Sequence, residues 1–260
     1  MHKYGEIQPD FYSERTRILN ALSQSENSHI VLRLIGALAF RTHCPQFGSL
    51  QDRLGRVFTD IDFATYTRHI ADVGRLLTEL GYEEDKMVTR LFGEGRMLFH
   101  DPLFGRHVYV FLDRLDFCHI LPLLGRLEAD ALTIPLAELL IEKMQIVQLN
   151  EKDIIDTMML LREHPIGEDD AETINAAVIS RLTANDWGLW RTLTANLRLV
   201  AGTLNGYPQL AEQDRAIIRQ RIAELQTRID AEPKSLKWKA RGKIGERVKW
   251  YREVEELAGR

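Results

Sequence analysis

The chain has little of what several protein classes require. Only two of its 260 residues are cysteine, Cys44 and Cys118, too few for a disulfide framework and better suited to a reducing compartment. No apolar run approaches the roughly 18 residues needed to cross a bilayer. The first ten residues have no apolar core of signal-peptide length. We therefore expect a cytoplasmic protein with no membrane partner.

The histidines and cysteines also lack the spacing typical of zinc sites. His43 precedes Cys44 and Cys118 precedes His119, but neither pair belongs to a Cys-x-x-Cys or similar chelating pattern. Free cysteines are commonly buried as small apolar residues. A Cys–His nucleophilic dyad would need a third orienting group, and the sequence identifies none. Packing is the favoured interpretation of both pairs.

What the chain does have is the balance of a folded protein, with 45% hydrophobic and 28% charged residues. Residue patterns change near position 130. Before it, they predict strands at 30–35 and 60–65, a helix over 68–80 and a hairpin of 96–100 with 107–113. After it, apolar stripes predict helices over 136–147, 150–161, 171–183, 187–200, 210–229 and 235–257. The expected fold class is α/β (α+β): a small mixed β-sheet domain, residues 1–130, followed by an all-helical region, residues 131–260.

The most informative stretch lies at the second predicted strand. Asp60 and Asp62 share one face of that strand, while Ile61 and Phe63 face the core. Two carboxylates about 7 Å apart repel each other unless a cation lies between them. Mg²⁺ commonly binds one or two carboxylates and substrate phosphates, and it could neutralise a triphosphate under attack. Asp-x-Asp is also common at strand ends that bind no metal.

A strand-to-helix turn precedes this pair. Strand 30–35 runs into Gly36-Ala37 and a short helix. Small residues let backbone N–H groups at a helix start approach a phosphate. Any strand-to-helix turn can use Gly-Ala, so the turn indicates a nucleotide site only together with the Asp-x-Asp strand downstream.

Together these features resemble the DNA-polymerase-β-type nucleotidyltransferase superfamily, whose pattern is a hydrophobic strand, a Gly-Gly or Gly-Ser turn, a short helix and Asp-x-Asp on the next strand. The chain is most similar to bacterial nucleotidyltransferases related to abortive-infection type IV toxins, which are toxin–antitoxin-like proteins. Arg56, Thr59, Asp60 and Asp62 approximate their first motif. The resemblance covers roughly residues 30–162.

Those proteins also carry a helical lysine followed some ten residues later by an Asp-x-x-Asp helix, and Lys143, Asp153 and Asp156 match this arrangement. Lys143 lies on or beside the apolar stripe of its predicted helix, so it must snorkel or bind an anion. That anion is either a triphosphate or a structural partner such as Asp153 or Asp156.

The resemblance implies Mg²⁺-dependent transfer of a nucleoside monophosphate from an NTP to an acceptor hydroxyl on RNA or tRNA, a protein or a small molecule. Asp60 and Asp62 would then hold the metal, the Gly36-Ala37 turn and Thr59 would contact the triphosphate, and Lys143 would neutralise it. Arg56, Asp153 and Asp156 would complete the nucleotide site.

One position departs from the superfamily pattern. Tyr109 stands where a third carboxylate is expected on a later strand, and Asp113 lies four residues further on, about 13 Å along a strand. Loss of a general base typically costs a factor on the order of 10²–10⁴ in rate. Three interpretations stay open: Asp113 or another acid substitutes, the enzyme is slow, or the domain binds nucleotide without turnover.

The C-terminal segment offers a third kind of function. Residues 234–252 contain eight Lys and Arg against one acid, a net +7 in a chain of net −4, so the remainder carries −11. Trp238, Trp250 and Tyr251 lie among these cations, a mixture that suits an RNA backbone with occasional stacking. The alternative is a surface helix whose acidic partner is the protein itself. Trp187 and Trp190 have helical spacing, which usually indicates core packing and less often base stacking.

Overall fold

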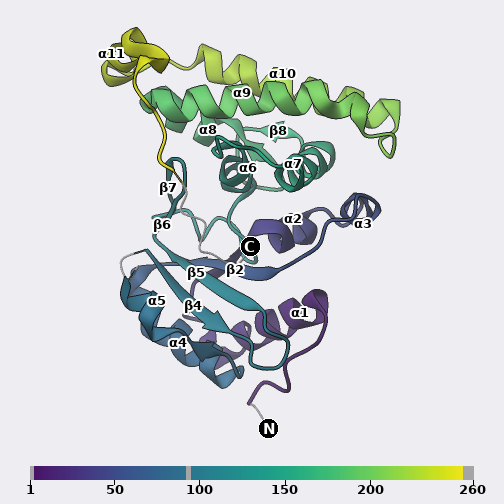
Figure 1. Ribbon diagram of the computed structural model, residues 1–260, viewed down its shortest axis with the longest axis vertical. Coiled ribbons are helices and arrows are strands. Elements are labelled where there is room, and N and C mark those ends of the chain that lie inside the picture. Colours follow the sequence, from purple (N-terminus) through teal and green to yellow (C-terminus); the bar gives the residue numbers. More distant parts are fainter. Residues whose placement is uncertain (1–2, 92–94, 254–260) are drawn as a thin grey trace. The chain divides into compact units, whose positions relative to one another are not determined.

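A computed structural model describes residues 3–91 and 95–253 (Figure 1). The chain forms two compact units. Unit 1 comprises residues 1–42, 57–115 and 122–135, and unit 2 comprises residues 43–56, 116–121 and 136–260. The predicted boundary near residue 130 places the short segments 43–56 and 116–121 in the first domain, whereas in the structure both group with the helical unit. No helix within the described ranges is long and apolar enough to cross a membrane.

Unit 1 is built on a mixed five-stranded sheet of order β1-β2-β5-β4-β3. The strands are β1 (Leu32–Ile35), β2 (Asp60–Thr65), β3 (Glu83–Glu84), β4 (Arg96–His100) and β5 (His107–Leu112). β2 and β5 are parallel, and the other neighbouring pairs are antiparallel. The predicted mixed α/β class is confirmed, and β2 has the predicted bounds.

One face of this sheet is apolar and fully buried. It carries Leu34, Ile61, Phe63, Phe99, Val108 and Val110, each with 0% exposure. The helices of unit 1 are α1 (Phe11–Leu22), α2 (Gly36–His43), α4 (Ile70–Glu79) and α5 (Lys86–Leu91). Figure 1 shows α1 and α4 on the same side of the sheet. Asp60 and Asp62 of β2 and their partners His107 and Tyr109 of β5 therefore lie on the opposite face.

Buried hydrogen bonds around an ion pair of α1 join this helix to the segment that follows α4. Glu14 is fully buried and accepts hydrogen bonds from Arg17 at 2.7 and 2.9 Å and from the Tyr82 hydroxyl. Arg17 also donates to the Leu80 carbonyl at 2.9 Å. α1 was not expected from the sequence, and this buried polar contact explains part of its stability, because an isolated helix of this length is marginal in water.

The hairpin predicted around residues 101–105 is confirmed. β4 and β5 pair antiparallel, and Asp101 organises the connection between them. Its carboxylate accepts from the amides of Leu103 and Phe104 and pairs with the buried Arg106 side chain at 2.6 Å. β3 and α5 are additional to the elements expected from the sequence.

Unit 2 is largely helical, as expected. Its helices are α3 (Ser49–Arg53), α6 (Leu136–Met144), α7 (Glu151–Glu163), α8 (Ala176–Asn185), α9 (Trp187–Thr203), α10 (Glu212–Ala231) and α11 (Leu236–Ile244). Asn150 caps α7, as predicted, by accepting from the Asp153 amide at 2.9 Å. Two short strands, β6 (Arg114–Asp116) and β7 (Ile120–Pro122), form a separate two-stranded sheet.

Two predicted helices of unit 2 are wrong at one end. Residues 171–175 are not helical, because β9 (Ile174–Asn175) pairs there with β8 (Ile166–Gly167) and Asn175 then caps α8. The predicted helix over 235–257 ends at Ile244, since Gly245 adopts a φ of +61° that breaks the helical path. Residues 254–257 lie outside the described residues.

Candidate functional site

The aspartate pair projects from one face of β2. Asp60 and Asp62 are half-buried, whereas Ile61 and Phe63 between and beyond them are fully buried. This alternation follows from the two-residue period of a strand. The strand therefore presents two carboxylates on the face opposite the apolar one.

Gly36 brings a helix start to the second carboxylate. Ile35 pairs with Asp62 across β1 and β2, so the next residue, Gly36, turns beside that side chain. Gly36 has a φ of +67°, a conformation that favours glycine. A Cβ added there would lie 2.9 Å from Asp62 Oδ2. The backbone angle of the turn thus favours glycine, and an added Cβ would require the Asp62 carboxylate oxygen to move.

Asp60 is oriented by two neighbours within unit 1. Thr59 Oγ1 donates a hydrogen bond to Asp60 Oδ2 at 2.8 Å. His107 Nδ1 lies 3.5 Å from Asp60 Oδ1, because the parallel register places these two residues side by side. Thr59 thus contacts Asp60, the candidate metal ligand.

Tyr109, at the position where the sequence led us to expect a third carboxylate, lies on β5. It pairs with Asp62 in the register of β2 with β5. Within residues 3–91 and 95–253, Asp60 and Asp62 do not form a group with a third His, Cys, Asp or Glu whose ligand atoms all lie within 4.8 Å of one another. The site of unit 1 therefore offers two carboxylates rather than three.

Two neighbouring histidines, His107 next to Asp60 and His100 next to His107, were not predicted as site residues from the sequence. The rings of His107 and His100 have centroids 5.0 Å apart, and His100 Nε2 lies 3.4 Å from Asp85 Oδ2. A signal was available, since His107 stands two residues before Tyr109 and so shares its face. His107 adds a group able to accept a proton beside the aspartate pair.

The structure does not bring Asp113 to the pair. This residue follows β5, with a φ of +60°, and its carboxylate accepts from the Thr67 amide and hydroxyl. Its own amide donates to Thr65, at the opposite end of β2 from Asp60. Asp113 therefore acts as a cap on the turn after β2, and it does not take the place that Tyr109 occupies.

Lys143, Asp153 and Asp156 do lie together in unit 2. Lys143 Nζ is 3.3 Å from Asp153, 3.7 Å from Asp156 and 3.5 Å from Glu142. Arg56 reaches Asp156 at 3.5 Å. The spacing of the two aspartates, three residues apart on α7, places both on one helical face.

This cluster is almost fully enclosed. The Lys143 side chain is 12% exposed and that of Asp156 is 0% exposed. Gln51 on α3 adds a hydrogen bond to Asp156 Oδ1 at 2.7 Å. Burial alone would lower the pKa of Lys143, yet Glu142, Asp153 and Asp156 raise it well above its ordinary value. The lysine is therefore charged, and three buried carboxylates of unit 2 share its charge.

The aromatic residues of the C-terminal segment pack against one another. Trp187 contacts Trp190 and Trp250 at ring separations of 6.2 Å, and Trp190 contacts Trp238 at 5.1 Å. Arg241 stacks over Trp187 at 4.8 Å. These contacts support packing as the role of the paired tryptophans.

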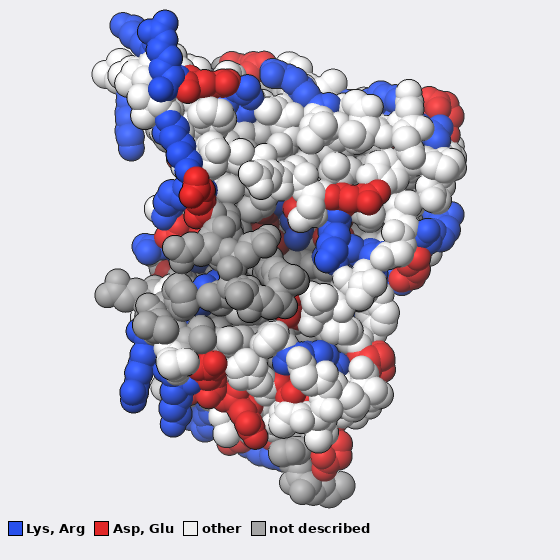
Figure 2. All heavy atoms as spheres, viewed as in Figure 1, with Lys and Arg blue, Asp and Glu red and all other residues white. Residues whose placement is uncertain are grey.

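The lysines of α11 have a different environment. Lys237, Lys239 and Lys243 are exposed, and Figure 2 shows Lys and Arg side chains projecting around α11. By contrast, Arg241 turns inward and donates to the Gly245 and Val248 carbonyls. The exposed lysines are available to a polyanion.

No protein-family model, curated protein or solved structure matches this chain.

Proposed function

We propose that unit 1 binds an NTP with Mg²⁺ and transfers its nucleoside monophosphate to an acceptor hydroxyl. The observation that supports this most is the approach of the Gly36 turn to Asp62, where an added Cβ would lie 2.9 Å from Oδ2. It places a helix start, which favours a phosphate, beside a carboxylate that favours a cation. Neither feature alone indicates a nucleotide.

The residues of this face fit Mg²⁺. Asp60 and Asp62 supply hard oxygen ligands on one face, and Mg²⁺ binds through one or two carboxylates with substrate phosphates and water completing its coordination. When bound, the metal would neutralise charge on the triphosphate. Ala37 follows Gly36 in the first turn of α2, and its side chain is small.

The reaction releases one proton, which a base must take up. The acceptor oxygen forms a bond to the α-phosphorus, the bond from that phosphorus to the bridging oxygen breaks, and pyrophosphate leaves. The hydroxyl proton must pass to a base. Asp113 is engaged at the other end of β2, whereas His107 lies beside Asp60. His107 therefore replaces Asp113 as the candidate base, and without a working base the unit would either turn over slowly or bind nucleotide without turnover.

Substituting either aspartate is expected to reduce label transfer by a factor on the order of 10² or more, because the metal supplies several kcal/mol of charge stabilisation. The assay incubates the protein with each α-labelled NTP, Mg²⁺ and either total RNA or a cell lysate. The variants are Asp60→Asn and Asp62→Asn. Asp113→Asn is the matched control, since asparagine tolerates positive φ and can still accept from Thr67.

Each outcome supports or contradicts one form of the proposal. Transfer that is lost in Asp60→Asn and Asp62→Asn but kept in Asp113→Asn supports the enzyme. Mg²⁺-dependent NTP binding without transfer supports the silent nucleotide-binding form. NTP binding that is equal in all four proteins contradicts a nucleotide site at β2.

A second candidate function is RNA binding through the exposed lysines of α11. Replacing Lys237, Lys239 and Lys243 with glutamine is expected to weaken RNA binding and to reduce the slope of log affinity against log salt by about 2, at about 0.7 per lost phosphate contact on a single strand. Filter binding at several salt concentrations measures both. Lys86, Arg90 and Lys152, also exposed, give a triple-glutamine control with the same charge change. An equal loss in both triple variants would indicate that RNA responds only to net charge.

A further inference from the structure

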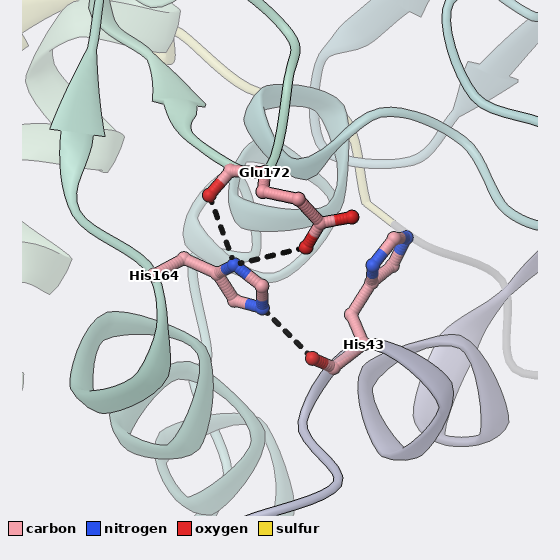
Figure 3. Close-up of side chains that lie close together, drawn as sticks. All are labelled: His43, His164 and Glu172. Atoms are coloured by element: carbon pink, nitrogen blue, oxygen red, sulfur yellow. Dashed lines mark hydrogen bonds and ion pairs between the residues drawn. The ribbon is translucent and has the colours of Figure 1, made fainter.

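Three potential metal ligands of unit 2 meet at a place that neither the nucleotide site nor the basic segment uses. They are His43, His164 and Glu172, whose ligand atoms all lie within 4.8 Å of one another (Figure 3). His43 ends α2, His164 caps the C-terminus of α7, and Glu172 belongs to the loop between β8 and β9. In the described part of the chain, this is the one such group of His, Cys, Asp or Glu.

The ring of His164 faces oxygen atoms on both sides. Nε2 lies 2.8 Å from the His43 carbonyl oxygen. Nδ1 lies 3.1 Å from the Glu172 carbonyl oxygen and 3.8 Å from Glu172 Oε2. A neutral imidazole has one N–H, so it can donate to only one of these sides. The other nitrogen then faces oxygen lone pairs, which is unfavourable unless a cation lies among them.

That cation is either a proton on His164 or a metal ion. For a metal, the N–H belongs on Nε2 and points to the His43 carbonyl, which leaves the Nδ1 lone pair toward Glu172. Histidines that bind metals usually donate their other N–H to a carbonyl or carboxylate, and this contact fixes the ring. The Nε2 contact of His164 has this form.

The distances are also close to those of a zinc site. Ligand atoms about 2.1 Å from a tetrahedral zinc are about 3.4 Å from one another. The 3.8 Å between His164 Nδ1 and Glu172 Oε2 needs only a small movement of the Glu172 side chain, which is 78% exposed and so can rotate freely. His164 is 6% exposed at its side chain and would remain fixed.

Two further observations concern the donor set. Glu172 has a φ of +58°, uncommon for glutamate, and this conformation directs both its carbonyl and its carboxylate to His164. Cys44, next to His43, is fully buried, and its thiol is not one of the ligand atoms of this group.

We propose that His43, His164 and Glu172 form a binding site for a divalent transition metal, with zinc as the best match, and with water at the fourth position. Two imidazoles and one carboxylate form a known zinc ligand set, and a fourth position open to solvent is usual for it. Bound metal would link residue 43 to the end of α7 and to the loop after β8. Two of its ligands, His43 and His164, lie 121 residues apart in sequence.

The test uses the full chain without an affinity tag that contains histidine. After removal of metals with EDTA, the protein is titrated with ZnCl₂, and zinc per chain is measured by elemental analysis and by calorimetry. We expect one zinc per chain and a higher thermal midpoint in zinc than in EDTA, because a ligand that binds only the folded state stabilises it. Zinc affinity should fall at least 10-fold in His43→Gln, His164→Gln and Glu172→Gln.

Two controls keep the result decisive. His29→Gln alters an exposed histidine of unit 1, with the same loss of one imidazole, and should bind zinc as the parent does. Glu172→Gln changes an exposed side chain and should fold even if His164→Gln does not. Absence of zinc uptake, or equal uptake in the parent and Glu172→Gln, would overturn the proposal. So would NMR detection, in the presence of zinc, of N–H protons on both ring nitrogens of His164, since a doubly protonated ring cannot bind metal.

Discussion

Replacing Lys143 with methionine is expected to destabilise the protein by about 3–5 kcal/mol, because it removes one partner from a buried ion pair and leaves the other charges uncompensated. Glu142, Asp153 and Asp156 lie 3.5, 3.3 and 3.7 Å from Lys143 Nζ. Arg56, 3.5 Å from Asp156, would remain as a cation beside that carboxylate. For a chain of this size the loss corresponds to roughly 10 °C in melting temperature. Thermal unfolding followed by circular dichroism measures it.

Lys152→Met is the matched control. Lys152 is exposed in the first turn of α7, and a surface substitution of this kind usually changes stability by no more than about 0.5 kcal/mol. If both variants lost the same stability, the ion pairs of Lys143 would contribute little. That outcome would favour a role for Lys143 in binding a ligand.

The pH dependence of this effect has a definite sign. The pKa of Lys143 is raised in the folded protein above its ordinary value of 10.5. A raised pKa means that the charged lysine contributes its full stability below the ordinary value and loses it only as pH rises through the raised one. The difference in melting temperature between the parent and Lys143→Met should therefore be the same at pH 7 and pH 9.

The sequence predicted best those features that depend on local patterns. β2 has the predicted bounds because charged and apolar residues alternate over 60–63, which is the pattern of a strand with one buried face. Asn150 caps α7 as predicted because asparagine at a helix start has a specific backbone partner. The end of α11 was less well predicted, although Gly245 was a visible signal for it.

Features that depend on distant residues could not be predicted in the same way. α1 carries the buried Glu14, and its partner Tyr82 lies 68 residues away, beyond the reach of local patterns. His43 and His164 are likewise joined only by the fold. Spacing along the chain favoured packing over a metal role for His43-Cys44, because it carries no information on His164. Conversely, the face shared by Asp60, Asp62, His107 and Tyr109 follows from strand periodicity, so His107 could have been named beforehand.

The nucleotide proposal makes its sharpest prediction at Gly36. Gly36→Ala is expected to lower affinity for Mg²⁺–NTP at least 10-fold, equivalent to about 1.4 kcal/mol. The added Cβ would lie 2.9 Å from Asp62 Oδ2, but at ordinary contact distances of 3.6 and 3.7 Å from Asp62 Cβ and Cγ. The carboxylate oxygen is the atom that must move. Since this oxygen belongs to the proposed metal ligand, the substitution should weaken metal and nucleotide binding. NTP binding by calorimetry measures it.

Gly105→Ala separates this effect from backbone strain. Gly105 belongs to the same unit and has a φ of +69°, close to the +67° of Gly36, yet a Cβ there would meet no atom within 4 Å. An L-residue in this conformation costs on the order of 1–2 kcal/mol. Both variants should therefore lose similar stability in urea unfolding, while only Gly36→Ala loses nucleotide affinity. If the two variants bound NTP equally well, the Gly36 turn and Asp62 would not act together, and the nucleotide site would have to be sought elsewhere in the chain.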